Sequence, residues 1–439
     1  MALTALMSVQ CALIVGITDS EEAALSSADG GGDGASGAQD GDTNDADLDG
    51  GPDAPCIQGG PGSVEGVIYD PTGTFPIHGV RVYALGDTGP PPDLAHGVKC
   101  IDRCGGAQYP KKAISTTVTR GDGYFLLPNI PADTPRTLVF QAGLWRRSVT
   151  VTAKSCSTIS LPKNMSTFAR NSTEGDLPHI AVATGASDPV ECLLRRLGVD
   201  DAEFMPGGSG TGRIHLFRSN GLDGETSPFP DATLLWNNSA TLALYDMVIL
   251  PCEGSNISRL ATPVANLVDY ANKGGRLFTT HYGFPNWITN ANSVWKSLFT
   301  GNSGGETALT LSSNVVTTTA KGNALATWLS AVGASSVPGV LPLQSAALDI
   351  ASIDDPQVSP FIITPQEASA STTPEYVTFD TPTNSPGATC GSVVFTDFHL
   401  VASGSGGKFP SACSNAPLTA QEKVLVWVLF DLETCPSLN

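Results

Sequence analysis

The most constraining feature of this sequence is a change in its hydrophobic pattern near residue 175. Before that point, short apolar segments alternate with turns, and none has the 3.6-residue period of a long helix. After it, apolar runs that suit buried strands alternate with segments that suit helices. Strands without helices pack as a sandwich, whereas alternating strands and helices form a parallel sheet covered on both faces. We therefore predict a multidomain protein in which an N-terminal antiparallel β-sandwich precedes a C-terminal three-layer α/β domain.

Composition and charge narrow the class of protein. The chain has 439 residues, a formal net charge of -19, 47 Gly and 32 Pro, and only 15% of its residues are charged. This composition suits folds rich in strands and turns and disfavours long helical arrays. An acidic chain gains nothing from releasing counterions at phosphates, so nucleic acid is not an expected partner. We expect a soluble globular protein of two or three domains.

The acidic residues are concentrated near the N-terminus. Residues 19–53 carry many Asp and Glu but no Lys or Arg, and too few apolar side chains to offset the entropy of ordering. We predict a disordered acidic linker over residues 19–55. Within it, residues 42–50 space their carboxylates like a calcium-binding loop, but the closing Glu and the flanking helices are missing. A solvated spacer is therefore the favoured interpretation.

The first residues indicate export. Residues 1–17 are apolar and too short to cross a bilayer as a helix, so we interpret 1–18 as an export signal. The usual basic residues are absent before Arg81, which leaves the true start site open. Cys11 stands where a lipid anchor would attach, and an incidental cysteine is an equal alternative. These features predict an extracytoplasmic protein that is periplasmic, anchored at the outer membrane or secreted.

The ten cysteines favour disulfides in an oxidising compartment, and none forms a CxxC pair. A disulfide needs Cα atoms within about 7 Å, so the predicted elements restrict the pairing. Cys390 precedes a predicted strand and Cys435 follows the last predicted helix, which places both at the N-terminal edge of the sheet. Cys192, Cys252 and Cys413 are all expected at the opposite edge, and because Cys192–Cys252 is the favoured pair there, Cys413 stays unpaired. The predicted disulfides are Cys390–Cys435, Cys192–Cys252, Cys56–Cys156 and Cys100–Cys104.

The first folded unit spans residues 56–160. Alternating segments at 80–84 and 115–119 and a turn at 121–123 indicate antiparallel strands without helices. Residues 66–82 and 119–130 resemble the carboxypeptidase regulatory-like, prealbumin-type sandwich. The resemblance implies a spacer or binding module without catalytic residues. The loop 86–112 departs from the plain module and is interpreted as a disulfide-tied insertion.

The second folded unit spans residues 175–439, with an insertion around 291–380. Asp188 and Pro189 are predicted to cap and begin a helix that ends at Gly198. Thr419 and Glu422 form the pattern of a capping box that opens the last helix. In the insertion only a helix at 324–332 and a strand at 376–379 can be recognised. The other predicted strands are 179–185, 245–251, 276–280 and 391–396.

Three segments of this unit, 246–251, 267–281 and 391–399, resemble the class I glutamine amidotransferase-like group, nearest to its trehalose-utilisation branch. The resemblance implies an open, flavodoxin-like α/β fold. In the catalytic members a cysteine nucleophile occupies the sharp turn where this chain has His281. Without that thiolate, glutamine hydrolysis is not expected.

Polar residues follow several predicted strands at one edge of the sheet. In open α/β sheets the loops after the strand C-termini form the ligand crevice. The candidate catalytic residues there are His281, His399, Glu253 and Asp397, which could bind a metal or perform acid/base chemistry. Alternatively, both histidines are structural and are bonded to the two acids. Cys252 is a further candidate nucleophile, unless it forms a disulfide and so has no free thiol.

Two functional classes remain open from the sequence. The first is an exported binding or scaffold protein, either lipid-anchored or free. Its amidotransferase-like domain would recognise a small polar or carbohydrate ligand. The second is a hydrolase of the trehalose-utilisation type that uses the crevice of histidines and acids. No organic cofactor is expected in either case, and a metal stays an open alternative. The missing nucleophile favours the first class, and the clustered His and acidic residues favour the second.

Overall fold

The computed structural model describes residues 59–100, 113–221, 228–302, 309–366, 371–383, 389–400 and 408–432. All of them belong to one compact unit. The predicted export signal, the acidic linker, Cys11, Cys56, Cys104 and Cys435 lie outside the described residues. Within the described ranges, no helix is both long and apolar enough to cross a membrane.

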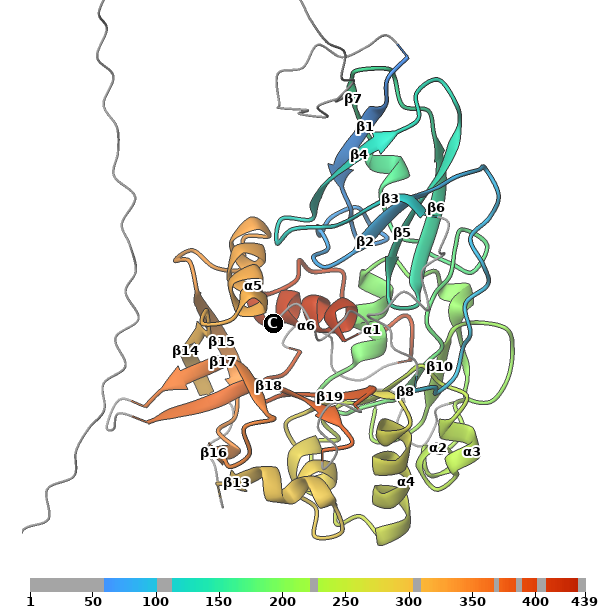
Figure 1. The fold of residues 1–439 in the computed structure, drawn as a ribbon. Helices are drawn as coiled ribbons and strands as arrows, with labels where there is room; N and C mark the ends of the chain where they lie inside the picture. The colour runs from blue at the N-terminus through green and yellow to red at the C-terminus, as the bar shows by residue number, and fades with distance from the viewer. Residues whose placement is uncertain are drawn as a thin grey trace, which may run out of the picture. The chain divides into compact units, whose positions relative to one another are not determined.

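Two small sheets are built from the N-terminal strands (Figure 1). One has the order β4-β1-β7 and the other has the order β3-β2-β5-β6. All pairs are antiparallel except β1 with β7, which run parallel. The strands are β1 (Gly62–Val67), β2 (Arg81–Leu85), β3 (Ala113–Val118), β4 (Tyr124–Ile130), β5 (Arg136–Ala142), β6 (Trp145–Val151) and β7 (Thr158–Ser160).

The two small sheets contribute to a common hydrophobic core. Val64 and Phe125 from the first sheet belong to the same buried cluster as Val82 and Phe140 from the second. The half-buried strand predicted at 80–84 is wrong in one respect: β2 is buried on both faces, because Val82 and Ala84 face this core while Tyr83 and Leu85 join Val139 in a separate small cluster. The parallel β1–β7 pair departs from the predicted all-antiparallel arrangement, because the chain changes sheets between β6 and β7.

A mixed sheet of ten strands dominates the rest of the chain, with the order β15-β14-β17-β18-β19-β12-β11-β8-β10-β9. From β19 to β9 all neighbours run parallel. From β15 to β19 all neighbours run antiparallel. The parallel strands are β8 (Ile180–Ala183), β9 (Phe204–Pro206), β10 (Ile214–Phe217), β11 (Met247–Leu250), β12 (Arg276–Thr280) and β19 (Gly391–Thr396).

The central strands are buried on both faces, as their continuous apolar runs predict. In β11, Met247 and Ile249 belong to one buried cluster while Val248 and Leu250 belong to another. This division follows from the two-residue period of a strand. Helices α1 and α6 contribute to the first cluster and α2, α3 and α4 to the second, so helices cover both faces (Figure 1).

The helices agree with the local signals in the sequence. The predicted capping box is present, since the Thr419 hydroxyl accepts from the Glu422 N–H and the Glu422 carboxylate accepts from the Thr419 N–H. The helices are α1 (Val190–Arg196), α2 (Thr233–Trp236), α3 (Ser239–Leu242), α4 (Ala261–Asn272), α5 (Ala320–Ala331), α6 (Ala420–Asp431), a π-helix η4 (Phe284–Ile288), and the 3-10 helices η1 (Lys163–Met165), η2 (Asp201–Glu203) and η5 (Val294–Leu298).

The insertion around 291–380 extends the large sheet. The helix and the strand predicted there are confirmed as α5 and β18. The other strands could not be recognised because several bury hydroxyl groups: Ser313 and Thr364 are buried and share a hydrogen bond of 2.7 Å. The strands are β13 (Phe299–Gly301), β14 (Leu309–Val315), β15 (Val340–Ala346), β16 (Ile350–Ile353), β17 (Ser359–Pro365) and β18 (Thr372–Thr381), with β13 and β16 forming a separate pair.

The disulfides correct the predicted pairing. Cys390 pairs with Cys100 at a Cα–Cα distance of 5.1 Å, so Cys390–Cys435 and Cys100–Cys104 are both wrong. The segment before Cys100 packs on the turn after α4, where a side chain on Gly274 would meet the Lys99 carbonyl oxygen at 2.1 Å. Cys100 belongs to the predicted loop of the sandwich, and no local pattern indicates that this loop reaches the large sheet.

A second disulfide joins Cys192 to Cys413 at a Cα–Cα distance of 5.2 Å. The predicted Cys192–Cys252 pair is therefore wrong, and Cys413 is not unpaired. Cys252 is a free, buried cysteine. The three residues do lie after strands at one edge of the sheet, but Cys413 is the one that lies within bonding distance of α1. Cys156 forms a disulfide, and because Cys56 lies outside the described residues, Cys56–Cys156 stays a prediction.

Candidate functional site

Four neighbouring parallel strands end at the candidate site. Cys252 follows β11, His281 follows β12, His399 follows β19, and Asp188 follows β8. These strands lie side by side in the order β19-β12-β11-β8. Because the strands are parallel, their C-terminal ends meet at one edge, which is where ligands bind in open α/β sheets. The structure places His281, His399 and Cys252 at this edge.

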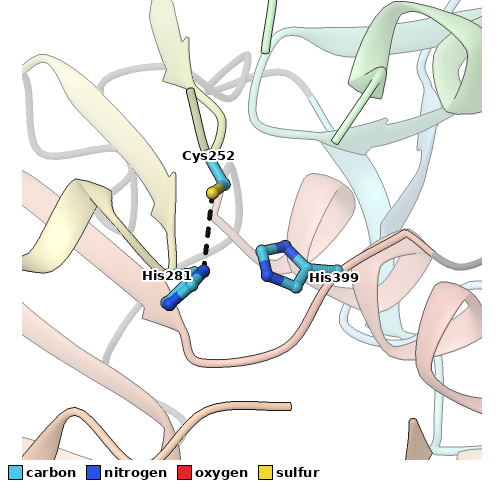
Figure 2. Close-up of side chains that lie close together, drawn as sticks. All are labelled: Cys252, His281 and His399. Carbon is cyan, nitrogen blue, oxygen red and sulfur yellow. Dashed lines mark hydrogen bonds between the residues drawn. The ribbon is translucent and has the colours of Figure 1, made fainter. Parts of the chain in front are cut away.

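Three of these side chains face one another (Figure 2). The Cys252 Sγ atom lies 3.5 Å from Nδ1 of His281, and the rings of His281 and His399 have centroids 4.6 Å apart. One ligand atom from each of the three residues lies within 4.8 Å of the others. We call Cys252, His281 and His399 the Cys–His–His cluster. Cys252 is 0% exposed and His281 is 4% exposed, so the cluster is largely buried.

The turn that carries His281 has an unusual backbone. His281 has a φ of 36°, which is in the region that favours glycine. Its N–H donates to the Thr396 carbonyl over 3.0 Å, and its ring stacks on Tyr282. Gly283 is required in this turn because a Cβ there would lie 1.7 Å from Oγ1 of Thr279. Strained positions of this type are held by the surrounding structure and cluster at functional sites.

Asp188 is a site residue that sequence analysis misassigned. It was predicted to cap α1, but α1 has no side-chain cap, and its N-cap residue is Pro189. The Asp188 carboxylate instead pairs with Nδ1 of His399 at 3.0 Å and accepts from the Leu400 N–H at 2.7 Å and from the Thr280 hydroxyl. Asp188 is fully buried and fixes the ring of His399.

Asp349 is a second carboxylate that sequence analysis missed, because it lies in the insertion where few elements could be recognised. Its Oδ2 atom lies 3.8 Å from Nε2 of His281, and neither atom has a hydrogen-bond partner. The Asp349 N–H donates to Asp397 over 2.6 Å. Asp397 is fully buried, so this predicted site residue acts by holding Asp349 beside His281.

Glu253 has a different environment from the one expected for a catalytic residue. Its carboxylate forms a buried ion pair with Arg259 and accepts hydrogen bonds from Ser219 and Asn286. The Arg259 guanidinium lies 4.6 Å from the ring of Trp236 and 4.5 Å from that of Trp287. Glu253 therefore anchors the loop that follows Cys252.

The charge states of the cluster follow from burial and from Asp188. Burial raises the pKa of the Cys252 thiol to about 12, and the Asp188 charge adds to the rise. Burial lowers the pKa of His281 to about 4, with a further contribution from His399. Burial also acts to lower the pKa of His399, but Asp188 outweighs it, and the pKa is raised. With no ion bound, the thiol and the His281 ring are neutral at pH 7.

The neighbouring acids also titrate above their ordinary range. Burial raises the pKa of Asp349 to about 6, although the hydrogen bond from Asp397 partly offsets this. Burial raises the pKa of Asp397 well above its usual value, and the charges of Asp349 and Glu375 add to the effect.

A separate cavity of about 220 Å³ lies away from the cluster. It is bounded by residues at the start of β12 and β19, such as Arg276 and Ser392, and by the buried ion pair of Lys321 with Asp431. These residues mark the N-terminal edge of the parallel strands, opposite to Cys252 and His281. We place the candidate site at the cluster because the reactive side chains converge there.

Comparisons with known proteins assign no family. No family model matches the chain, and no curated protein matches it. Among solved structures, it is similar to a ThuA-like protein from Bacteroides uniformis ATCC 8492, with 9% identity over 57% of this chain and 88% of that chain and a TM-score of 0.31. It is also similar to the cytoplasmic protein STM3548 from Salmonella typhimurium, with 10% identity over 58% of this chain and 98% of that chain and a TM-score of 0.32.

A third similar structure is Gan42B, a GH42 β-galactosidase, with 10% identity over 61% of this chain and a TM-score of 0.29. The match spans only 32% of that chain. Identities and TM-scores at this level carry no argument about activity. The resemblance to the trehalose-utilisation branch therefore stays a prediction from the sequence.

Proposed function

We propose that the protein is an exported hydrolase that acts on a small polar substrate, and that its ligand crevice lies at the Cys–His–His cluster and Asp349. The observation that carries this proposal is the convergence of Cys252, His281 and His399 after three neighbouring strands, with a carboxylate beside each imidazole. A scaffold needs no such arrangement. Reactive groups with shifted pKa values in one crevice are typical of catalytic centres.

Water is the nucleophile that this crevice favours. Cys252 contacts His281, which resembles a cysteine–histidine nucleophile pair. However, a reactive cysteine needs a lowered pKa and access for the substrate, whereas the Cys252 thiol has a pKa raised to about 12 and is 0% exposed. Hydrolysis by an activated water avoids both obstacles.

The two described disulfides support an extracytoplasmic location. They join segments separated by 290 and 221 residues, and such links persist in oxidising compartments. A carbohydrate is one small polar substrate that fits the resemblance stated from the sequence. Fractionation that recovers the native protein from the cytosol with all thiols free would contradict this extracytoplasmic location.

The proposal is tested with chromogenic esters, amides, phosphate esters and glycosides offered to the purified full chain. We expect turnover of at least one class, and we expect His281→Asn and His399→Asn to reduce it by about 100-fold or more. His179→Asn is the matched control, because His179 is also partly buried but lies before β8 at the opposite edge. Wild-type turnover in both site variants would contradict this proposal. If no class of substrate is turned over while a sugar still binds, the binding or scaffold role replaces it.

A further inference from the structure

The Cys–His–His cluster has the ligand spacing of a transition-metal centre. In a tetrahedral zinc site with Zn–S of about 2.3 Å and Zn–N of about 2.0 Å, the sulfur and nitrogen atoms lie about 3.5 Å apart. The distance from Cys252 Sγ to His281 Nδ1 is 3.5 Å. No ligand atom of the cluster is more than 4.8 Å from another, so small side-chain rotations bring His399 into place.

The histidines are held in the ring orientations that metal ligands need. Asp188 pairs with Nδ1 of His399, which leaves Nε2 of that ring for the cluster. Asp349 faces Nε2 of His281, which leaves Nδ1 of that ring facing Cys252. Histidines that bind metals almost always present their other ring nitrogen to a carboxylate, a carbonyl or water. His399 meets this condition, and His281 faces the Asp349 carboxylate at 3.8 Å without a hydrogen bond.

Two unsatisfied atoms give independent support. Nε2 of His281 and Oδ2 of Asp349 are buried, have no hydrogen-bond partner and lie 3.8 Å apart. A cation bound at Nδ1 would make the Nε2–H group a stronger donor and draw the Asp349 carboxylate to it. On the sulfur side, the Gly254 N–H already lies 3.4 Å from Cys252 Sγ, a contact that would stabilise a thiolate.

We infer that Cys252, His281 and His399 bind one divalent transition-metal ion of the zinc type, with a fourth position left for water. One thiolate and two imidazoles suit zinc and cobalt and exclude magnesium and calcium, which require oxygen ligands. A zinc ion with three protein ligands lowers the pKa of its bound water to about 7. The inference deepens the proposed hydrolase and rests on the same crevice, because such an ion would activate the water.

The test is metal analysis of the full chain purified without an affinity tag that chelates metal. We expect one Zn²⁺ per chain after loading and dialysis. We expect Co²⁺ loading to give a thiolate-to-cobalt charge-transfer band and the visible bands of tetrahedral cobalt. Cys252→Ser should abolish the charge-transfer band, and Asp188→Asn should weaken Zn²⁺ binding by about 10- to 100-fold. His215→Asn is the control, because His215 is equally buried but lies in β10 outside the cluster.

Wild-type protein that retains well under one Zn²⁺ per chain, or cobalt spectra unchanged in Cys252→Ser, would overturn the inference. Circular dichroism of each variant identifies loss of fold. If a variant unfolds, wild-type protein decides the matter, since Co²⁺ loading must produce the charge-transfer band and a chelator must remove it. Stoichiometric Zn²⁺ without turnover would refute only the hydrolase. Turnover that survives complete removal of metal would refute only the activation of water by the ion.

Discussion

At the residue scale, the most informative side chains are charged groups in the interior. Asp188 was misassigned as a helix cap because an Asp before a Pro at a helix start is a strong local signal. Its role beside His399 depends on a contact across 211 residues. Glu253 was placed at the correct edge, but its ion pair with Arg259 depends on the two tryptophan rings that hold the guanidinium.

The Glu253–Arg259 pair gives a residue-scale prediction. Arg259→Ala leaves a carboxylate buried without its cation, and we expect the free energy of unfolding to fall by about 3 kcal/mol. Glu253→Gln added to Arg259→Ala should recover part of this loss, because the uncompensated charge is removed. Urea unfolding of the two single variants and the double variant measures the coupling. Strictly additive losses would show that the pair contributes no coupling.

The turn at 281–283 gives a second prediction. Gly283→Ala introduces a Cβ that would lie 1.7 Å from the Thr279 hydroxyl, so the turn must shift. We expect a loss of about 2 kcal/mol in stability and displacement of His281 from Cys252. Gly208→Ala shows the opposite case: its φ of 75° disfavours alanine while open space surrounds it, whereas Gly283 has a φ of -62° that alanine adopts freely. Unchanged stability of Gly283→Ala in urea unfolding would show that the turn accommodates the close contact without cost.

At the element scale, a disulfide ties α1 to the segment before α6. Cys192 lies in α1, which begins just after Asp188. Cys413 lies between His399 and α6 in the sequence. The bond therefore links the two elements that hold the Asp188–His399 pair. The sequence predicted both helices, because their apolar periods and caps are local. It could not predict this link, because three cysteines compete at the same edge.

Removing this disulfide should destabilise the chain and loosen the site. For a closed loop of 221 residues, the chain-entropy model gives about 5 kcal/mol as an upper value. We expect Cys192→Ser with Cys413→Ser to lower the melting temperature by at least several degrees. Scanning calorimetry measures the shift, and peptide mapping without reductant should recover Cys100–Cys390 and Cys192–Cys413. Recovery of a Cys192–Cys252 link would contradict the structure.

At the scale of the whole molecule, the small sheets and the large sheet share one core. Trp145 of β6 packs on Phe430 of α6, with ring centroids 5.2 Å apart, and His78 stacks on Trp427. The Trp328 indole of α5 donates to the Pro76 carbonyl over 2.5 Å. A buried network lies at the N-terminal edge of the parallel strands, opposite to the Cys–His–His cluster. The Tyr245 hydroxyl bonds Nδ1 of His215 at 2.8 Å, and Nε2 of His215 lies 3.5 Å from Nε2 of His179.

This network makes stability depend on pH. Burial, with a contribution from His179, lowers the pKa of His215 from 6.5 to about 4. The unfolded chain therefore binds the proton more readily, so the contribution of neutral His215 is complete above about pH 6.5 and is lost as the pH falls toward 4. We expect wild-type protein to lose about 2 kcal/mol more than His215→Asn between about pH 7 and pH 4.5. Equal losses in urea unfolding would show that His215 titrates normally.

The sequence by itself determined the four parallel strands β8, β11, β12 and β19, the helices α1, α5 and α6, and the edge of the sheet where His281, His399 and Cys252 lie, but not the parallel strands β9 and β10. These features follow from periods and caps that act within a few residues. The tertiary structure decided which cysteines pair, that Asp188 and Asp349 stand beside the histidines, and that Glu253 is held by Arg259. These contacts depend on strand order and on loops that cross between sheets. No local pattern specifies them, because the free energy that selects them comes from packing the whole chain.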